Sequence, residues 1–111
     1  MTGKFELKKS TNGQFMFNLK ASNGQVILTS ELYKAKVDAQ GGIESVKKNA
    51  SNDASYERKI SAKKEPYFVL KATNGQTIGK SEMYSSDAAM EGGITSVKAN
   101  APSASFQDLA I

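Results

Sequence analysis

The chain has 111 residues, enough for one compact domain but too few for two independent hydrophobic cores. It contains neither cysteine nor histidine, which excludes disulfides, thiolate metal sites and nucleophile pairs that use histidine as a base. The 15 Lys and Arg residues exceed the 11 Asp and Glu residues, giving a formal charge of +4. These basic residues are scattered along the sequence, so the chain lacks the basic blocks that signal a nucleic-acid-binding tail.

The first predicted element is a strand that begins near Phe5, in the segment FELK. The opening residues MTGKFELKK contain no apolar run after the charged side chains. We therefore expect neither a signal peptide nor a membrane span, and we expect the protein to be cytoplasmic.

Apolar and polar residues then alternate along residues 15–21, which predicts a half-buried strand. Asn12-Gly13 marks the hairpin before this strand, and Asn23-Gly24 marks the hairpin after it. For the second of these we predict a tight type I′ turn, because asparagine and glycine both tolerate positive φ. A short strand follows through Ile27.

After Tyr33 the spacing of apolar residues changes to that of a helix. One predicted face contains Ala35, Ala39, Ile43, Val46 and Ala50. This helix has no obvious N-cap, and Gly41-Gly42 interrupts it at a cost of about 1 kcal/mol for each glycine. Gly42 falls beside the apolar face, where it lets the helix approach the sheet closely, whereas Gly41 points outward.

The second half of the chain repeats the first at an offset of 51 residues. Residues 15–50 and 66–101 are identical at 19 of 36 positions, including Asn-Gly-Gln, Ser-Glu-x-Tyr and Gly-Gly-Ile. The repeat predicts a strand over residues 67–72, a hairpin at Asn74-Gly75, a short strand through Ile78 and a second helix. The second helix has Ser85 as a candidate N-cap. Its predicted apolar face consists of Met90, Ile94, Val97 and Ala101, with Gly93 beside this face and Gly92 pointing outward.

Repeated units with NGQ, SExY and GGIxSVKxNA at these spacings closely resemble the YegP-like family of small, uncharacterised bacterial domains. The resemblance implies an α+β fold of two tandem β(3)-α-β repeats that form one continuous antiparallel sheet. It also implies that the two helices pack on one face and that the C-terminal strands are exchanged. The family brings no established activity, cofactor or catalytic residue.

The chain is thus predicted to be a single domain, residues 1–111, made of two repeats at about 4–53 and 54–111. One repeat cannot bury its apolar face alone, so two copies complete one core. We expect residues 54–61 to close the first unit and open the second, and residues 105–109 to cross back to the first unit. Because the duplication replaces a dimer, we predict a monomer.

Two features of the sequence could carry function. Glu31 with Tyr33, and Glu82 with Tyr84, place a carboxylate and a phenol before each predicted helix. Such groups could serve acid–base chemistry, but an acidic residue near a helix N-terminus is also a structural feature, and we favour the structural interpretation.

The second feature is the sheet face away from the helices, with six candidate binding residues: Met16, Asn18, Lys20, Tyr67, Val69 and Lys71. The first hypothesis is a non-enzymatic module, without cofactor or metal, that binds a protein or peptide through this face or a sheet edge. The alternative is weak, sequence-independent nucleic-acid binding, which a single exposed aromatic residue supports poorly.

Overall fold

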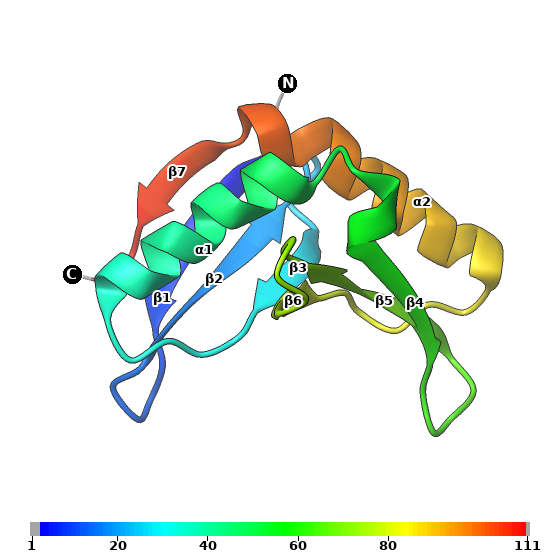
Figure 1. Ribbon diagram of the computed structural model, residues 1–111, viewed down its shortest axis with the longest axis horizontal. Coiled ribbons are helices and arrows are strands. Elements are labelled where there is room, and N and C mark those ends of the chain that lie inside the picture. Colours follow the sequence, from blue (N-terminus) through cyan, green and yellow to red (C-terminus); the bar gives the residue numbers. More distant parts are fainter. Residues whose placement is uncertain (1–2, 111) are drawn as a thin grey trace.

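The computed structural model describes residues 3–110 and has an α+β architecture, with two helices packed on one face of a seven-stranded sheet (Figure 1). The first half contains β1 (Lys4–Lys9), β2 (Phe15–Lys20), β3 (Val26–Ser30) and α1 (Lys36–Asn49). The second half contains β4 (Tyr56–Ile60), β5 (Pro66–Lys71), β6 (Thr77–Lys80), α2 (Asp87–Asn100) and β7 (Ser105–Asp108). Two short 3₁₀ helices, η1 (Asp53–Ser55) and η2 (Ala101–Ser103), lead into β4 and β7. The predicted fold class and the expected strands and helices are confirmed.

The strand order is β4-β5-β6-β3-β2-β1-β7, so the two units meet at the centre of the sheet. The central β3–β6 pair is antiparallel and short, with Thr29 opposite Lys80 and Ser30 opposite Gly79. Figure 1 shows the sheet bent into an arch at this centre, with both helices on its outer side and the β1–β2 and β4–β5 turns extending away from them. The uncovered face of the sheet is therefore concave.

The prediction of a purely antiparallel sheet is wrong at one strand. β7 returns from the second unit to the first, as expected, but it pairs with β1 in parallel, with Phe5 opposite Phe106 and Leu7 opposite Asp108. The reason is topological: α2 runs from the outer end of the second unit back to the N-terminal end of β1, so β7 enters beside Lys4 and runs in the direction of β1. The sheet is consequently mixed, with five antiparallel strand pairs and one parallel pair, β1 with β7.

The core lies between the helices and the sheet, and its two halves repeat the same aromatic packing. Phe5 packs edge-on against Phe17 with ring centroids 5.9 Å apart, and Tyr56 packs edge-on against Phe68 at 5.6 Å. The predicted helix faces are confirmed, since Ala39, Ile43, Val46, Ala50, Met90, Ile94, Val97 and Ala101 are all buried. Burial of this continuous apolar layer is the main stabilising contribution to the fold.

The turns of the hairpins differ from the predicted type I′ form. At Asn23-Gly24 only the glycine has positive φ (87°), Gly24 N donates to the Ala21 carbonyl, and Ala21 N donates to the Gln25 carbonyl. This is a three-residue hairpin loop, which needs positive φ at a single position. Asn23 instead accepts a hydrogen bond from Gln25 N through its side chain. The same loop follows β4, with Lys64 (φ 64°) at the position that glycine occupies elsewhere.

At the N-terminus of α2, one further prediction is wrong. Ser86, not Ser85, is the N-cap of α2, and its hydroxyl accepts a hydrogen bond from Ala89 N. The start of α1, at Ala35, has no side-chain cap, as predicted. Neither helix, nor any other helix within residues 3–110, is long and apolar enough to cross a membrane.

Candidate functional site: the open edge of β4 and the uncovered face

The Ser-Glu-x-Tyr segments are built into the core through their serine and tyrosine residues. Ser30 Oγ accepts a hydrogen bond from Phe17 N and donates one to the Glu31 carbonyl, both at 2.8 Å. The Tyr33 ring stacks on Phe17 with centroids 6.3 Å apart. Ser81, Tyr84 and Phe68 make the same contacts in the second unit.

The two glutamates of these segments are exposed, and neither forms an ion pair with another residue of the described chain. Burial, and then the charges of Glu31 and Asp38, raise the pKa of Tyr33, so its phenol stays neutral at physiological pH. Burial likewise raises the pKa of Tyr84. Neither phenol is activated as a base, and these contacts give the repeated motif a packing role.

The buried glycines of the helices make room for these tyrosines. A Cβ on Gly42 would lie 2.5 Å from Tyr33 Oη, and one on Gly93 would overlap Tyr84 Oη. The expectation that both glycines allow close packing is confirmed, although the nearest neighbour is a tyrosine side chain rather than the sheet backbone. A Cβ on Gly41 or Gly92 would meet no atom within 4 Å.

The six candidate binding residues lie on β2 and β5, at positions that alternate with the buried Phe17, Leu19, Phe68 and Leu70. Asn18 and Val69 are nonetheless buried, with 7% and 6% of their surface exposed, because neighbouring side chains cover them. Asn18 Nδ2 also donates a hydrogen bond to Thr29 Oγ1 at 3.0 Å. Met16, Lys20, Tyr67 and Lys71 are half-buried, so these four present the accessible part of the predicted set.

The fold gathers lysines on this face that are scattered in the sequence. By strand register and ion pairing, the uncovered face carries Lys4, Lys8, Lys20, Lys59, Lys71 and Lys80, together with Glu6 and Glu57. Six lysines against two glutamates give the face a formal charge of +4, which equals that of the whole chain. The pairing of strands far apart in the sequence produces this clustering, so counting adjacent lysines could not find it.

Glu6 is the most enclosed charge on the face. Its carboxylate lies 3.0 Å from Lys20 Nζ, 3.4 Å from Lys4 Nζ and 3.8 Å from Lys8 Nζ, and only 8% of the side chain is exposed. The hydrogen bond from Lys20 lowers the Glu6 pKa, and the opposing effect of burial is smaller. Glu57, its counterpart on the edge strand β4, is 45% exposed and pairs with Lys71 and Lys59. The difference arises because β1 lies inside the sheet whereas β4 lies at its edge.

The two ends of the sheet are not equivalent, even though the units are duplicated. β1 has β7 on its outer side, but within residues 3–110 no strand pairs with the outer side of β4. One strand, β4, both follows α1 and opens the second unit, so seven strands replace the eight that two separate β(3)-α-β units would supply. The sequence predicted this shared segment but not the open edge that results from it.

A groove runs along the open edge. It has a volume of about 360 Å³ and lies between β4 and α2, lined by Arg58, Lys59, Ile60, Asp87, Met90 and Glu91. Ile60 is 68% exposed, and Phe106 on β7, the strand at the other edge of the sheet, is 46% exposed. On the other side of the molecule β7 runs beside α1 on the outer side of β1, with Phe106 next to Ile43 and Lys47.

Arg58 holds the inner wall of this groove in place. Its guanidinium binds Glu91 through Nε at 2.5 Å and Nη2 at 3.0 Å, and it also contacts Asp53 at 3.3 Å. The hydrogen bond from Arg58 lowers the Glu91 pKa, and Lys98, at 2.9 Å, lowers the Asp53 pKa. Arg58 corresponds to Leu7 of the first unit at the repeat offset of 51 residues. Leu7 is fully buried on β1, which β7 covers on its outer side.

The acidic side chains were also compared with the arrangement that a metal site requires. No group of three histidine, cysteine, aspartate or glutamate side chains within residues 3–110 is arranged to hold a metal ion. The candidate binding groups described above are the backbone of the β4 edge, the groove beside it and the lysines of the uncovered face.

Comparisons with known proteins find relatives over nearly the whole chain. The model of a domain of unknown function, DUF1508, matches twice, at residues 10–57 and 61–108. The UPF0339 protein of Pseudomonas aeruginosa is 55% identical over 108 residues, covering 97% of this chain and 98% of the relative. The UPF0339 protein YegP of Yersinia pestis is 52% identical over 109 residues, covering 98% of this chain and 97% of the relative.

Two solution NMR structures have the same fold. A UPF0339 protein from Shewanella oneidensis superposes with a TM-score of 0.93 at 52% identity, covering 99% of this chain and 93% of the other. The protein of unknown function yegP from E. coli superposes with a TM-score of 0.94 at 49% identity, covering 99% of this chain and 95% of the other. The names of these four relatives state no activity or ligand.

Proposed function

The chain belongs to the UPF0339 family, as its YegP-like motifs indicate, and we propose that it is a non-enzymatic module that binds an extended protein segment at the open edge of β4. The observation that carries this proposal is the missing eighth strand. β1 is completed by β7, whereas the same strand of the second unit has no outer neighbour. The module is expected to be a cytoplasmic monomer.

The physical basis is strand addition. An unpaired edge presents backbone N–H and C=O groups at the spacing of a strand, and an added strand satisfies them while its side chains select the partner. Here the groove beside α2 adds an apolar surface, formed mainly by the exposed Ile60, with the buried Met90 beneath it. A bound segment would place alternate side chains in this groove.

A selection experiment tests the proposal. The intact protein is used to select binders from a displayed library of random eight-residue peptides. We expect binders whose affinity falls about tenfold on Ile60→Asp, because the exposed isoleucine contributes apolar contact and the new charge opposes strand pairing.

Val37→Asp is the matched control, since Val37 is also exposed (69% against 68% for Ile60) but lies in the first turn of α1, in the other unit. Binders affected equally by the two substitutions, or a selection that yields no binder dependent on Ile60, would contradict the proposal.

A second candidate function is weak polyanion binding at the uncovered face, supported by its formal charge of +4 and its concave shape. Tyr67 is its one aromatic residue, and Lys80 lies over that ring at 5.8 Å. Binding through such a surface is electrostatic and weakens steeply as the salt concentration rises.

The polyanion alternative is tested by titrating labelled single-stranded and duplex oligonucleotides at low and physiological salt. The variants are the double substitution Lys59→Ala/Lys80→Ala and the single substitution Tyr67→Ala. Lys20 is left unchanged, because a glutamate there would place a second carboxylate beside the buried Glu6. Submicromolar affinity that survives physiological salt and is lost in Tyr67→Ala would favour this function over strand addition. Loss of binding with salt would leave only diffuse attraction.

A further inference from the structure

The pairing of β7 with β1 shows how an added strand binds at the outer edge of the first unit. The two strands run parallel, with Ser105 N donating to the Gly3 carbonyl at 3.1 Å and Leu109 N donating to the Leu7 carbonyl at 2.8 Å. Asp108 lies opposite Leu7 and forms an ion pair with Lys36, in the first turn of α1. A charge on the added strand is thus recognised by the start of the neighbouring helix.

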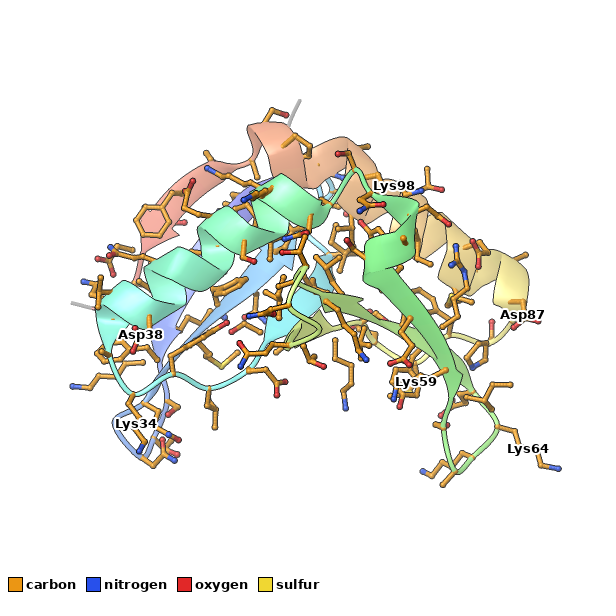
Figure 2. The ribbon with its side chains drawn as sticks, in the orientation of Figure 1. Lys34, Asp38, Lys59, Lys64, Asp87 and Lys98 are labelled. Atoms are coloured by element: carbon orange, nitrogen blue, oxygen red, sulfur yellow. The ribbon has the colours of Figure 1, made fainter. Side chains whose placement is uncertain are left out.

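The equivalent position beside β4 has the opposite charge. At the repeat offset of 51 residues, Lys36 corresponds to Asp87, the first residue of α2. Asp87 is exposed, lines the groove, and has no ion-pair partner in the described part of the chain. Figure 2 shows it at the outer end of α2, on the side of the β4–β5 hairpin, far from Asp38 at the start of α1.

The other charges of the groove leave Asp87 available. Arg58, a cation of β4 that lines the groove, is held by Glu91 and Asp53, and Lys98 is held by Asp53. Lys59 pairs with Glu57 on the opposite face of the sheet. A basic side chain on an added strand would therefore find Asp87 as its free acidic partner.

Building on the proposed function, we infer that the β4 edge takes a strand that runs parallel to β4 and carries a basic residue facing Asp87. The segment is apolar two residues after this basic residue, at the inward position that lies opposite Ile60. The reversed charge also excludes the chain's own C-terminal strand, because Asp108 of a second copy would face Asp87.

This exclusion has a structural benefit. Insertion of β7 from one molecule at the β4 edge of the next would be a head-to-tail contact that does not close, and such contacts build filaments. The edge is thus selective by charge: it is open to a basic strand and closed to the acidic strand that the molecule itself carries.

Two synthetic peptides test the inference on the intact protein. One has the sequence of residues 103–110, SASFQDLA, and the other is the same peptide with Asp108→Lys. Chemical-shift titration of the ¹⁵N-labelled protein is expected to give about fivefold tighter binding of the lysine peptide, the ratio that an exposed ion pair provides.

Substitutions in the protein supply the controls. Asp87→Lys should reverse the peptide preference, Asp87→Asn should abolish it, and Asp38→Lys, which makes the same charge change at the start of α1, should leave it unchanged. Equal binding of both peptides to the parent protein, or a preference that ignores Asp87, would overturn the charge selectivity while leaving strand addition intact.

A spin label on the lysine peptide tests the orientation. In the parallel arrangement, a label at the peptide C-terminus broadens amide signals near Ile60, and one at the N-terminus broadens those near Tyr56. The reverse pattern would overturn the parallel assignment. Absence of binding by either peptide would also overturn the inference, whereas the proposed function is tested separately by the library selection with Ile60→Asp and Val37→Asp.

Discussion

At the scale of single residues, packing contacts explain why the Ser-Glu-x-Tyr and Gly-Gly-Ile motifs occur in both units. The serine and tyrosine of Ser-Glu-x-Tyr are fixed by a buried hydrogen bond and a stacked ring, and the second glycine of Gly-Gly-Ile makes room for that tyrosine. The sequence identified the inward glycine by helical periodicity. It could not identify its neighbour, because Tyr33 reaches Gly42 through the loop before the helix rather than from the sheet.

The two adjacent glycines should respond oppositely to alanine. We expect Gly42→Ala to destabilise the protein by about 1–3 kcal/mol, because the new methyl group would overlap Tyr33 Oη and Phe17. Gly41→Ala should stabilise it by roughly 0.5–1 kcal/mol, since nothing lies near that position and alanine is the better helix former. Urea denaturation of both variants checks the prediction, and a ranking in the opposite order would contradict this account of the helix face.

Glu6 should make stability depend on pH. Its folded-state pKa is lowered, mainly by the hydrogen bond from Lys20, so its contribution is fully present above the unfolded value of about 4.3 and is lost as the pH falls through the folded value. Glu6→Gln should cost about 1–2 kcal/mol at neutral pH, and the difference from the parent should narrow below about pH 4.

Denaturant melts of the parent and variant across this pH range measure the effect of Glu6. Glu57→Gln is the matched control and should have the smaller effect, because Glu57 is 45% exposed. A constant difference between parent and Glu6→Gln across the range would show that the carboxylate does not carry the stabilisation.

At the scale of secondary-structure elements, local signals predicted most of the strands and both helices. Asn-Gly pairs marked three of the hairpins, but the β4–β5 turn has Lys64 in the left-handed region and gave no comparable signal. The parallel pairing of β7 was also missed, since strand direction depends on where α2 delivers the chain and not on the residues of β7 themselves.

The junction between the units breaks the repeat in a way that can be tested. Leu28 is fully buried, and its counterpart in the repeat is Gly79. A Cβ on Gly79 would lie 2.8 Å from the Thr29 carbonyl and 3.0 Å from Leu28 Cγ, so one large side chain fills the space of two.

Gly79→Ala should therefore destabilise the protein by about 1–3 kcal/mol through overpacking. Because the new methyl group would contact Leu28, the Leu28→Ala/Gly79→Ala pair should cost less than the sum of its single substitutions. Strict additivity in a denaturant-based double-mutant cycle would contradict direct packing across this junction.

At the scale of the whole molecule, the duplication makes one continuous core but two different ends. The first end is completed by β7, and the second leaves β4 unpaired beside a groove. The sequence predicted the shared and returning segments, whereas the open edge and the clustering of lysines depend on strand order and register. The candidate binding residues on the uncovered face were selected by alternation alone, which could not show that neighbouring side chains bury Asn18 and Val69.

Amide hydrogen exchange of the intact protein tests this central asymmetry most directly. At low protein concentration, the amides of β1 should be protected on both sides of the strand, because β2 and β7 flank it. Those amides of β4 that do not bond to β5 should exchange nearly as fast as loop amides. Uniform protection along β4, matching that of β1, would mean that its outer edge is already covered and would contradict the open edge on which the proposed function rests.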